Sequence, residues 1–208
     1  DDPAGHPGVN EAELALIRKD DEPPSATDPA PKTGATPWRG MARNVALRWL
    51  CGQQICRAAG YMFFASWFPT FLQETRGLSI AASGGLQSLV FLATFLGSLG
   101  GGWLTDRIWA RTGNLRLSRR MVGSACLFAC GCLILFAWFV NSLPMAMALL
   151  ISGAFCAALA GPCSFATTID IGGNHVPQVM GTMNMAGNLS AASCPVIVAY
   201  LFSWTANW

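Results

Sequence analysis

Long apolar runs constrain this chain more than any other feature of its sequence. A transmembrane helix needs about 20 mostly apolar residues, and five runs of about that length or more lie at 44–72, 81–104, 121–140, 145–168 and 180–203. The runs are continuous and do not alternate with polar residues, which favours helices over a β-barrel. We therefore predict an all-α integral membrane protein, with about five transmembrane helices in residues 41–208 and the lipid bilayer as its surroundings.

Charge divides the chain into two unlike segments. Residues 1–40 carry 8 acidic and 4 basic side chains, whereas residues 41–208 carry 3 acidic and 9 basic ones. Charged residues make up 12% of the whole chain, against about 25% in an ordinary soluble domain. This composition disfavours a nucleic-acid-binding protein, a disulfide-stapled secreted domain and an ordinary globular enzyme.

The first forty residues are rich in proline and polar side chains. Seven of the 12 prolines lie within residues 1–37, and such a stretch cannot bury enough apolar surface to offset the entropy lost on ordering. We expect residues 1–40 to be largely disordered, with a flexible linker at 20–37. A short helix is predicted at 9–19, where Asn10 and Glu13 form a loose capping box.

Arginines are concentrated in one break between the apolar runs. The segment 106–120 holds Arg107, Arg111, Arg116, Arg119 and Arg120. The breaks on the opposite side hold only Arg76, beside Glu74. Since cytoplasmic loops carry the excess of Lys and Arg, we predict that the 106–120 loop and residues 1–40 are cytoplasmic.

A deep arginine marks a candidate binding site in the first run. Gln53, Arg57 and Tyr61 are spaced four residues apart and share one helix face, and Gln54 is adjacent. Arg57 lies about 14 Å beyond Arg48 at 1.5 Å per residue. A charge at that depth costs at least about 2.5–3.5 kcal/mol on insertion scales. Two interpretations remain open: Arg57 meets an anionic ligand, or it makes a structural bond to helix carbonyls or to a helix outside this chain.

Hydroxyl and amide groups of two later runs extend the candidate site. A Gly-Pro step at 161–162 breaks the fourth run and frees backbone carbonyls, and Ser164 and Thr167 follow it. In the fifth run, Asn184 and Asn188 share a helix face. Broken helices with polar groups form substrate sites in transporters. The alternative is that the hydroxyls bond to their own helix and the amides to neighbouring helices.

Motifs of enzymes and metal sites do not occur in the sequence. The eight cysteines lie within the apolar runs and form no CxxC pair, and both histidines lie outside the runs. No HExxH, GxSxG or phosphate-loop pattern is present. We therefore expect no catalytic residue, no metal site and no organic cofactor, and no nucleic-acid partner.

Several segments resemble the anion:cation symporters of the major facilitator superfamily. GYMFFASWFPTFLQETRGLS (60–79) is similar to their seventh helix and the turn after it, and GTMNMAGNLSAASCPVIVAYL (181–201) to their eleventh helix. HPGVNEAELALI (6–17) is similar to the acidic segment of their central loop. GGWLTDRIWARTG (101–113) resembles the cytoplasmic signature between helices 8 and 9, which is matched by Gly102, Asp106 and Arg107. Trp109 stands where that signature has a glycine.

The resemblance implies that the chain covers the central loop and helices 7–11 of a C-terminal bundle, without helix 12 and without the N-terminal bundle that would be its partner. The family moves small organic anions such as sugar acids, usually with a proton or sodium ion, and a bacterial inner membrane is its expected location. The substrate-binding residues would be Gln53, Gln54, Arg57, Tyr61, Ser164, Thr167, Asn184 and Asn188. The gating residues would be Gly102, Asp106 and Arg107.

Three alternatives remain beside an organic-anion carrier. The first is a carrier of another major facilitator subfamily that moves neutral sugars or drugs. The second is a carrier-like membrane sensor that transports nothing. The third is an intramembrane enzyme, which is disfavoured because no apolar run contains a His, Asp or Glu in its interior.

Overall fold

The computed structural model describes residues 8, 10–20 and 38–205, and all regular structure in that part of the chain is helical. The chain divides into two units, residues 1–35 and 36–208. In the first unit, α1 (Glu11–Asp20) begins after Asn10, whose Oδ1 accepts a hydrogen bond from the backbone of Glu13 at 2.8 Å. This is the helix predicted at 9–19. Apart from Asp20, the linker predicted at 20–37 lies outside the described residues.

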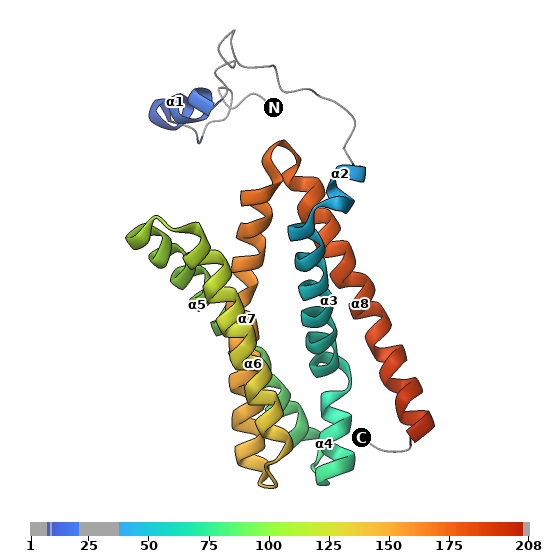
Figure 1. Ribbon diagram of the computed structural model, residues 1–208. Helices are drawn as coiled ribbons and strands as arrows, with labels where there is room; N and C mark the ends of the chain where they lie inside the picture. Colours follow the sequence, from blue (N-terminus) through green and yellow to red (C-terminus); the bar gives the residue numbers. More distant parts are fainter. Residues whose placement is uncertain (1–7, 9, 21–37, 206–208) are drawn as a thin grey trace. The chain divides into compact units, whose positions relative to one another are not determined.

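The second unit is a bundle of long helices (Figure 1). A helix occupies each of the five apolar runs, and the first run holds two. The elements are α2 (Trp38–Arg43), α3 (Val45–Ser66), α4 (Phe68–Arg76), α5 (Ile80–Thr112), a π-helix (Arg116–Met121), α6 (Val122–Trp138), α7 (Leu143–Gly172), a short 3₁₀ helix (Gly173–His175) and α8 (Val176–Thr205).

Glycines and small polar residues set the ends of these helices. Asn44 caps α3 by accepting hydrogen bonds from two backbone N–H groups of its first turn. Gly77 and Gly113 end α4 and α5 with φ values of 62° and 60°. Only a residue without Cβ adopts this left-handed conformation at little cost, so both turns depend on glycine.

The basic segment 106–120 is mostly helical, which corrects the prediction of a loop there. Helix α5 continues to Thr112, and the π-helix begins at Arg116. Arginine is a good helix former, so the charged side chains of this segment do not interrupt the helix. Gly113, which follows α5 directly, does so.

The first run also differs from prediction, because it contains a break at Trp67 between α3 and α4. Pro69 has no N–H, so the carbonyl of Ala65 loses its partner within the helix. Gln87 of α5 supplies the missing donor: its Nε2 donates to the carbonyl oxygens of Phe64 and Ala65, both at 3.0 Å. The break is therefore held by a side chain of the next helix.

Three helical stretches of the described chain are long and apolar enough to cross a membrane, at 80–112, 116–138 and 143–205. The last of these contains both α7 and α8. Helix α3 is less apolar because it carries two arginines and two glutamines.

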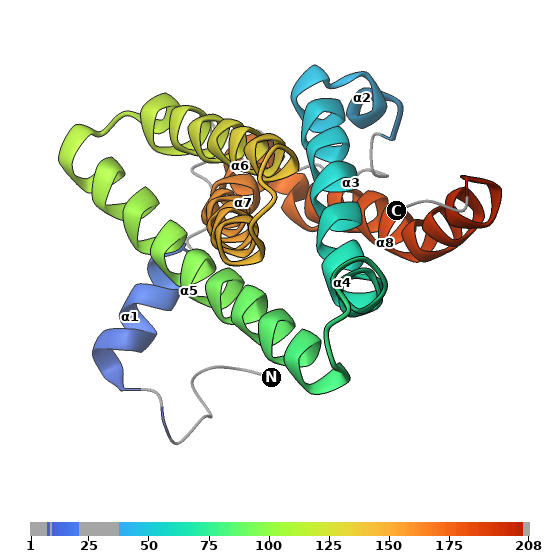
Figure 2. The same ribbon diagram turned by 90° about the horizontal axis from the view of Figure 1, so that it is seen from below.

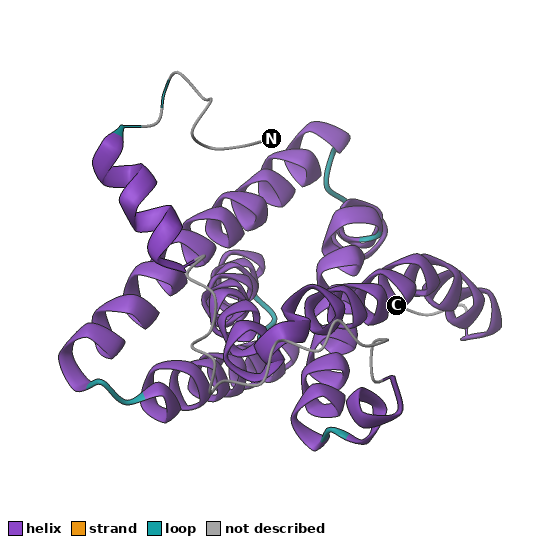
Figure 3. Ribbon diagram, turned by 90° about the horizontal axis from the view of Figure 1, so that it is seen from above, coloured by secondary structure: helices purple, strands orange, loops and turns teal. Residues whose placement is uncertain are grey.

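Helix α7 packs between α5 and α6, and α3 packs against α8 (Figures 2 and 3). Glycines bring α5 and α7 together: a Cβ on Gly97 would lie 2.5 Å from the Phe155 carbonyl oxygen, and one on Gly101 would overlap the backbone of Leu159. Where α4, α5 and α7 meet, the core consists of Phe68, Leu72, Val90 and Met147.

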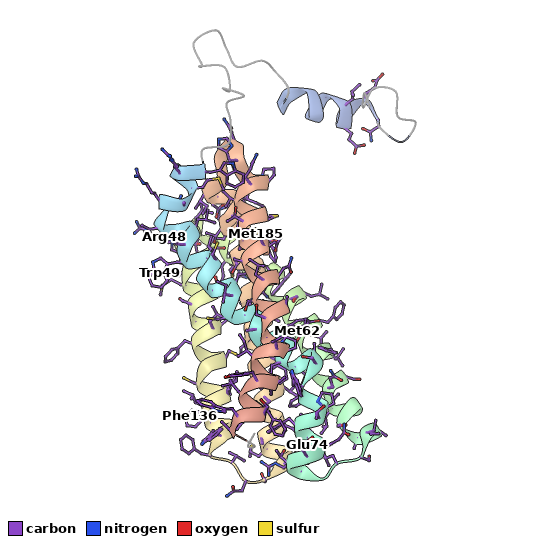
Figure 4. All side chains as sticks on the ribbon, turned by 90° about the vertical axis from the view of Figure 1, so that its right-hand side faces the viewer. Arg48, Trp49, Met62, Glu74, Phe136 and Met185 are labelled. Carbon is purple, nitrogen blue, oxygen red and sulfur yellow. The ribbon has the colours of Figure 1, made fainter. Side chains whose placement is uncertain are left out.

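The outer surface of the bundle is apolar (Figure 4). Phe128 is 75% exposed and Phe136 62%, while Arg48 and Glu74 lie toward opposite ends of the bundle. A water-soluble bundle would present charged side chains at such positions, whereas a lipid-facing surface is apolar. This is the surface of an integral membrane protein.

Candidate functional site

A cavity of about 400 Å³ lies among α3, α5, α6 and α7. Its polar lining comes mainly from α3, which contributes Gln53, Arg57 and Tyr61, and the remainder of the wall is largely apolar. Tyr61 forms part of the rim, since its side chain is 53% exposed and its ring centroid lies 5.9 Å from that of Phe91 on α5. The volume is in the range of sites for small ligands.

Arg57 is the cation of this cavity. Its Nε donates to Oε1 of Gln54 at 3.2 Å, and its guanidinium lies against Gly161 of α7. Within the described residues no carboxylate pairs with Arg57, because the ion pair found there joins Arg119 Nε to Asp170 Oδ2 at 3.3 Å. An unpaired cation among apolar walls acts strongly on a nearby anion, since little water screens its charge.

Gln54 lies on a different face of α3 from the other predicted residues. Its side chain is 9% exposed and packs against Gly187 of α8, so it lines neither this cavity nor the second one. The sequence places Gln54 near the site, and the structure makes it the hydrogen-bond partner of Arg57.

A second cavity, of about 610 Å³, adjoins the first between α3, the π-helix, α6 and α7. Ser164 and Thr167 line it, and Gln53 lines both cavities. Ser164 Oγ donates to Gln53 Oε1 at 3.1 Å, and Thr167 Oγ1 donates to the carbonyl of Cys163 at 2.7 Å. The structure thus brings Gln53, Arg57, Tyr61, Ser164 and Thr167 together around two adjoining cavities.

Asn184 and Asn188 do not join this group. Both are exposed on α8 and line neither cavity. The face of α8 that meets α3 is formed by Gly187 and Ser190, whose Oγ donates to the carbonyl of Ile55 at 2.8 Å. A helix turns about 100° per residue, so the two amides lie to the side of that contact.

The predicted gating residues lie at the end of α5. Asp106 and Arg107 are exposed, and the Arg107 guanidinium carbon lies 5.4 Å from the centroid of the Trp103 ring. Gly102 has open space where a Cβ would stand. The tight contact with α7 comes instead from the neighbouring Gly101.

Sequence reasoning missed a buried polar cluster beneath the gating residues. Ser118 Oγ donates to the carbonyl of Thr105 at 2.6 Å, and Thr105 Oγ1 lies 3.2 Å from Cys163 Sγ. These three side chains are at most 2% exposed. Small polar residues on separate helices share no periodic pattern, so nothing in the sequence links them. The Arg119–Asp170 ion pair could have been found from the sequence. Asp170 is the only acidic residue in 107–208, so it is the one carboxylate there with which an arginine of 107–120 could pair.

Metal chemistry has no candidate centre in the described part of the chain. No group of three or more His, Cys, Asp or Glu side chains there could hold a metal ion.

Comparison with known proteins shows a match to a protein family and likeness to individual transporters. A family profile described as Major Facilitator Superfamily matches residues 12–205. The chain is 27% identical over 221 residues to the probable galactarate/D-glucarate transporter of Escherichia coli (strain K12), which covers 100% of this chain and 47% of that protein. It is 31% identical over 179 residues to the probable sulfoacetate transporter of Cupriavidus necator, covering 84% of this chain and 40% of that protein.

The hexuronate transporter of Bacillus subtilis (strain 168) is a further relative, 28% identical over 149 residues, with 70% of this chain and 35% of that protein covered. The chain therefore spans about half, or less, of the length of the curated relatives it matches.

Proposed function

Because this chain belongs to the major facilitator superfamily, whose members here are transporters and not enzymes, we propose that it is part of a secondary active transporter for a small organic anion such as a sugar acid. The observation that carries the proposal is Arg57, a cation that lines a cavity of about 400 Å³ and has no carboxylate partner among the described residues. The names of the relatives, which refer to galactarate, D-glucarate, hexuronate and sulfoacetate, support an anionic substrate.

The chemistry of the site fits a hydroxylated carboxylate. Arg57 uses Nε for Gln54, and the guanidinium fork can offer its Nη hydrogens to a carboxylate in a charge-assisted bond. The amide of Gln53 and the hydroxyl of Ser164, which already bond to each other at 3.1 Å, can exchange that bond for bonds to sugar hydroxyls. An aldarate or aldonate carries both kinds of group.

We further propose that transport proceeds by alternating access, in which two helical bundles rock around a site near the middle of the membrane. This chain supplies one wall, and a second bundle of the same protein supplies the other. Asp106 and Arg107 act as part of the gate, near the end of α5 that we propose to be cytoplasmic.

Coupling to a proton or sodium ion also belongs to the proposal. In the second unit the acidic residues of the described chain are Glu74, Asp106 and Asp170, all exposed near helix ends. A carboxylate within the bilayer, of the kind that carries protons in many transporters, is absent from this part of the protein. We place the coupling group elsewhere in the full-length carrier.

The proposed location is the inner membrane of a bacterium, with the arginine-rich end of α5 and the π-helix in the cytoplasm. The support for this orientation is the arginine distribution, since the five arginines between 107 and 120 lie at one end of the bundle. Residues 1–40 would then lie on the same side of the membrane.

Uptake of D-glucarate by cells that express the full-length protein tests the proposal. Arg57→Gln removes the cation and should lower uptake at least about tenfold, because a charged hydrogen bond contributes about 1.5–3 kcal/mol. Arg48→Gln is the matched control, since Arg48 lies exposed on the same helix and lines neither cavity. Equal uptake by the Arg57→Gln variant and the wild type, at equal expression, would overturn the proposal.

A further inference from the structure

We propose that Gly161 is a positioning residue for Arg57, and that its missing side chain sets where the guanidinium lies and hence how tightly the anion binds. This inference rests on the proposed function, because it assigns a determinant of affinity to the same site. Gly161 does not line either cavity itself.

The first observation is a close contact between two helices. Gly161 is buried on α7, and a Cβ placed there would lie 3.1 Å from Nη1 of Arg57 and 3.8 Å from its Cζ. The Nη1 distance is shorter than ordinary van der Waals contact, so any side chain at this position displaces the guanidinium. The Nη1 side of the Arg57 guanidinium therefore packs against the backbone of α7 at Gly161.

The second observation concerns the opposite edge of the same group. Nε of Arg57 donates to Oε1 of Gln54 at 3.2 Å. Gln54 is itself held by another glycine, because a Cβ on Gly187 of α8 would lie 2.8 Å from its Cγ and 3.1 Å from its Nε2. Two glycines therefore determine where the guanidinium lies. Gly161 of α7 contacts it directly, and Gly187 of α8 acts through Gln54.

Because of these two contacts, the orientation of the guanidinium of Arg57 in the cavity is fixed. Within the described residues, neither Nη atom has a hydrogen-bond partner, and the group lines the cavity. A planar fork recognises a carboxylate through two parallel N–H bonds only when its plane is oriented correctly. A shift of a few tenths of an ångström at Gly161 should therefore affect affinity without removing the charge.

Gly161 differs from the other glycines near the cavity, because a side chain at its position would contact Arg57. Gly60 of α3 and Gly131 of α6 line the same cavity, and a Cβ on either would meet nothing within 4 Å. The matched controls are Gly52 of α3 and Gly84 of α5, which line neither cavity and have open space where a Cβ would stand.

The experiment measures the kinetics of D-glucarate uptake by the full-length protein. Gly161→Ala should raise KM about threefold to tenfold, as expected for partial loss of a charged hydrogen bond, with kcat changed less than twofold. Gly52→Ala and Gly84→Ala should leave KM within about twofold. An unchanged KM for Gly161→Ala, in a protein that transports D-glucarate, would overturn the inference.

A double variant separates positioning from a purely structural role. Arg57→Lys keeps the charge but lacks the Nη1 atom that meets Gly161. In that background Gly161→Ala should change KM less than twofold, since coupled effects vanish when one partner is gone. The same penalty with lysine as with arginine would show a general packing effect and would contradict the inference.

Gly187→Ala gives a second route to the same answer if Gly161→Ala lowers expression. It should displace Gln54 and raise KM in the same direction, whereas Gly181→Ala, in open space on the same helix, should not. An unchanged KM for Gly187→Ala would contradict the inference.

Thermal unfolding of the purified protein distinguishes failure of this inference from failure of the proposed function. If the wild type does not take up D-glucarate or related anions, the proposed function is overturned. The contact is then decided by the melting temperature alone: Gly161→Ala should lower it with Arg57 present and not in the Arg57→Ala background. Equal shifts in the two backgrounds would overturn the contact as well.

Discussion

The guanidinium of Arg57 is held in place by neutral groups, and this is the central feature of the site at the scale of single residues. Gln54 accepts from its Nε at 3.2 Å, Gly161 supports its Nη1 edge, and no carboxylate of the described chain neutralises it. A buried carboxylate beside it would form an ion pair and compete with a substrate for the same donors. The amide holds the arginine without satisfying its charge.

Two substitutions at Gln54 test this statement against each other. Gln54→Glu puts a carboxylate where the amide oxygen lies and should lower D-glucarate uptake at least about tenfold, because the ion pair replaces the substrate. Gln54→Leu removes the acceptor and adds no charge, so its effect should be clearly smaller. Uptake and expression of both variants are measured in the same cells, and equal losses would contradict the account.

Only part of the candidate site could be predicted from residues alone. The four-residue spacing of Gln53, Arg57 and Tyr61 predicts one face of α3, and all three line the cavity. The same reasoning does not reveal that Gln54 turns toward α8, because the direction of a side chain beside the main face depends on which helix packs there. Asn184 and Asn188 share a face, but that face is not the one that meets α3.

At the scale of the helices, the close packing of α5 on α7 depends on two glycines of α5 that face α7. A third glycine of α5 does not contact α7. Gly97 and Gly101 lie against the backbone of α7, whereas a Cβ on Gly102 would meet nothing within 4 Å. Small residues permit such an approach in lipid, where no hydrophobic force drives helices together.

Gly101→Ala should therefore destabilise the protein and Gly102→Ala should not. The added methyl group at 101 meets the backbone of Leu159, which cannot move aside as a side chain can. Overpacking of this kind costs typically about 1–3 kcal/mol, while a change at an open position stays within about 0.5 kcal/mol. Thermal unfolding in detergent measures both, and a lower melting temperature for Gly102→Ala than for Gly101→Ala would contradict the packing described.

The helices themselves were predictable from the apolar runs, and their interruptions were less so. A run of apolar residues shows where a helix lies but not where its hydrogen bonds fail, so the break at Trp67 requires knowledge of Gln87 on another helix. Conversely, the arginines of 106–120 indicate that this segment lies in water, but they do not indicate a loop, because arginine is a good helix former. In that segment Gly113, with φ of 60°, is the residue that ends α5.

At the scale of the whole molecule, the described bundle consists of apolar helices around a small number of polar contacts. Its exterior carries large exposed apolar side chains, while its interior holds the Arg57 site and, near the arginine-rich end, the buried cluster of Thr105, Ser118 and Cys163. This division is what a carrier needs: an apolar surface for lipid, a polar site for the substrate, and a junction at the proposed gate.

The chain spans about half of its relatives' length, or less, and the property of the proposed carrier that this part of it determines through Arg57 is the charge of the substrate. If Arg57 selects the ligand by charge, a molecule with the same carbon chain and hydroxyl groups but no carboxylates should not compete. D-glucitol is such a molecule beside D-glucarate.

Competition for D-glucarate uptake is therefore the most direct test, with the full-length protein purified and reconstituted in lipid vesicles. Unlabelled D-glucarate should displace the labelled substrate, while D-glucitol at a hundredfold excess, about 2.7 kcal/mol in binding free energy, should not. The Arg57→Gln variant should take up D-glucarate at least about tenfold less than the wild type. Displacement by D-glucitol as effective as that by D-glucarate would contradict the account.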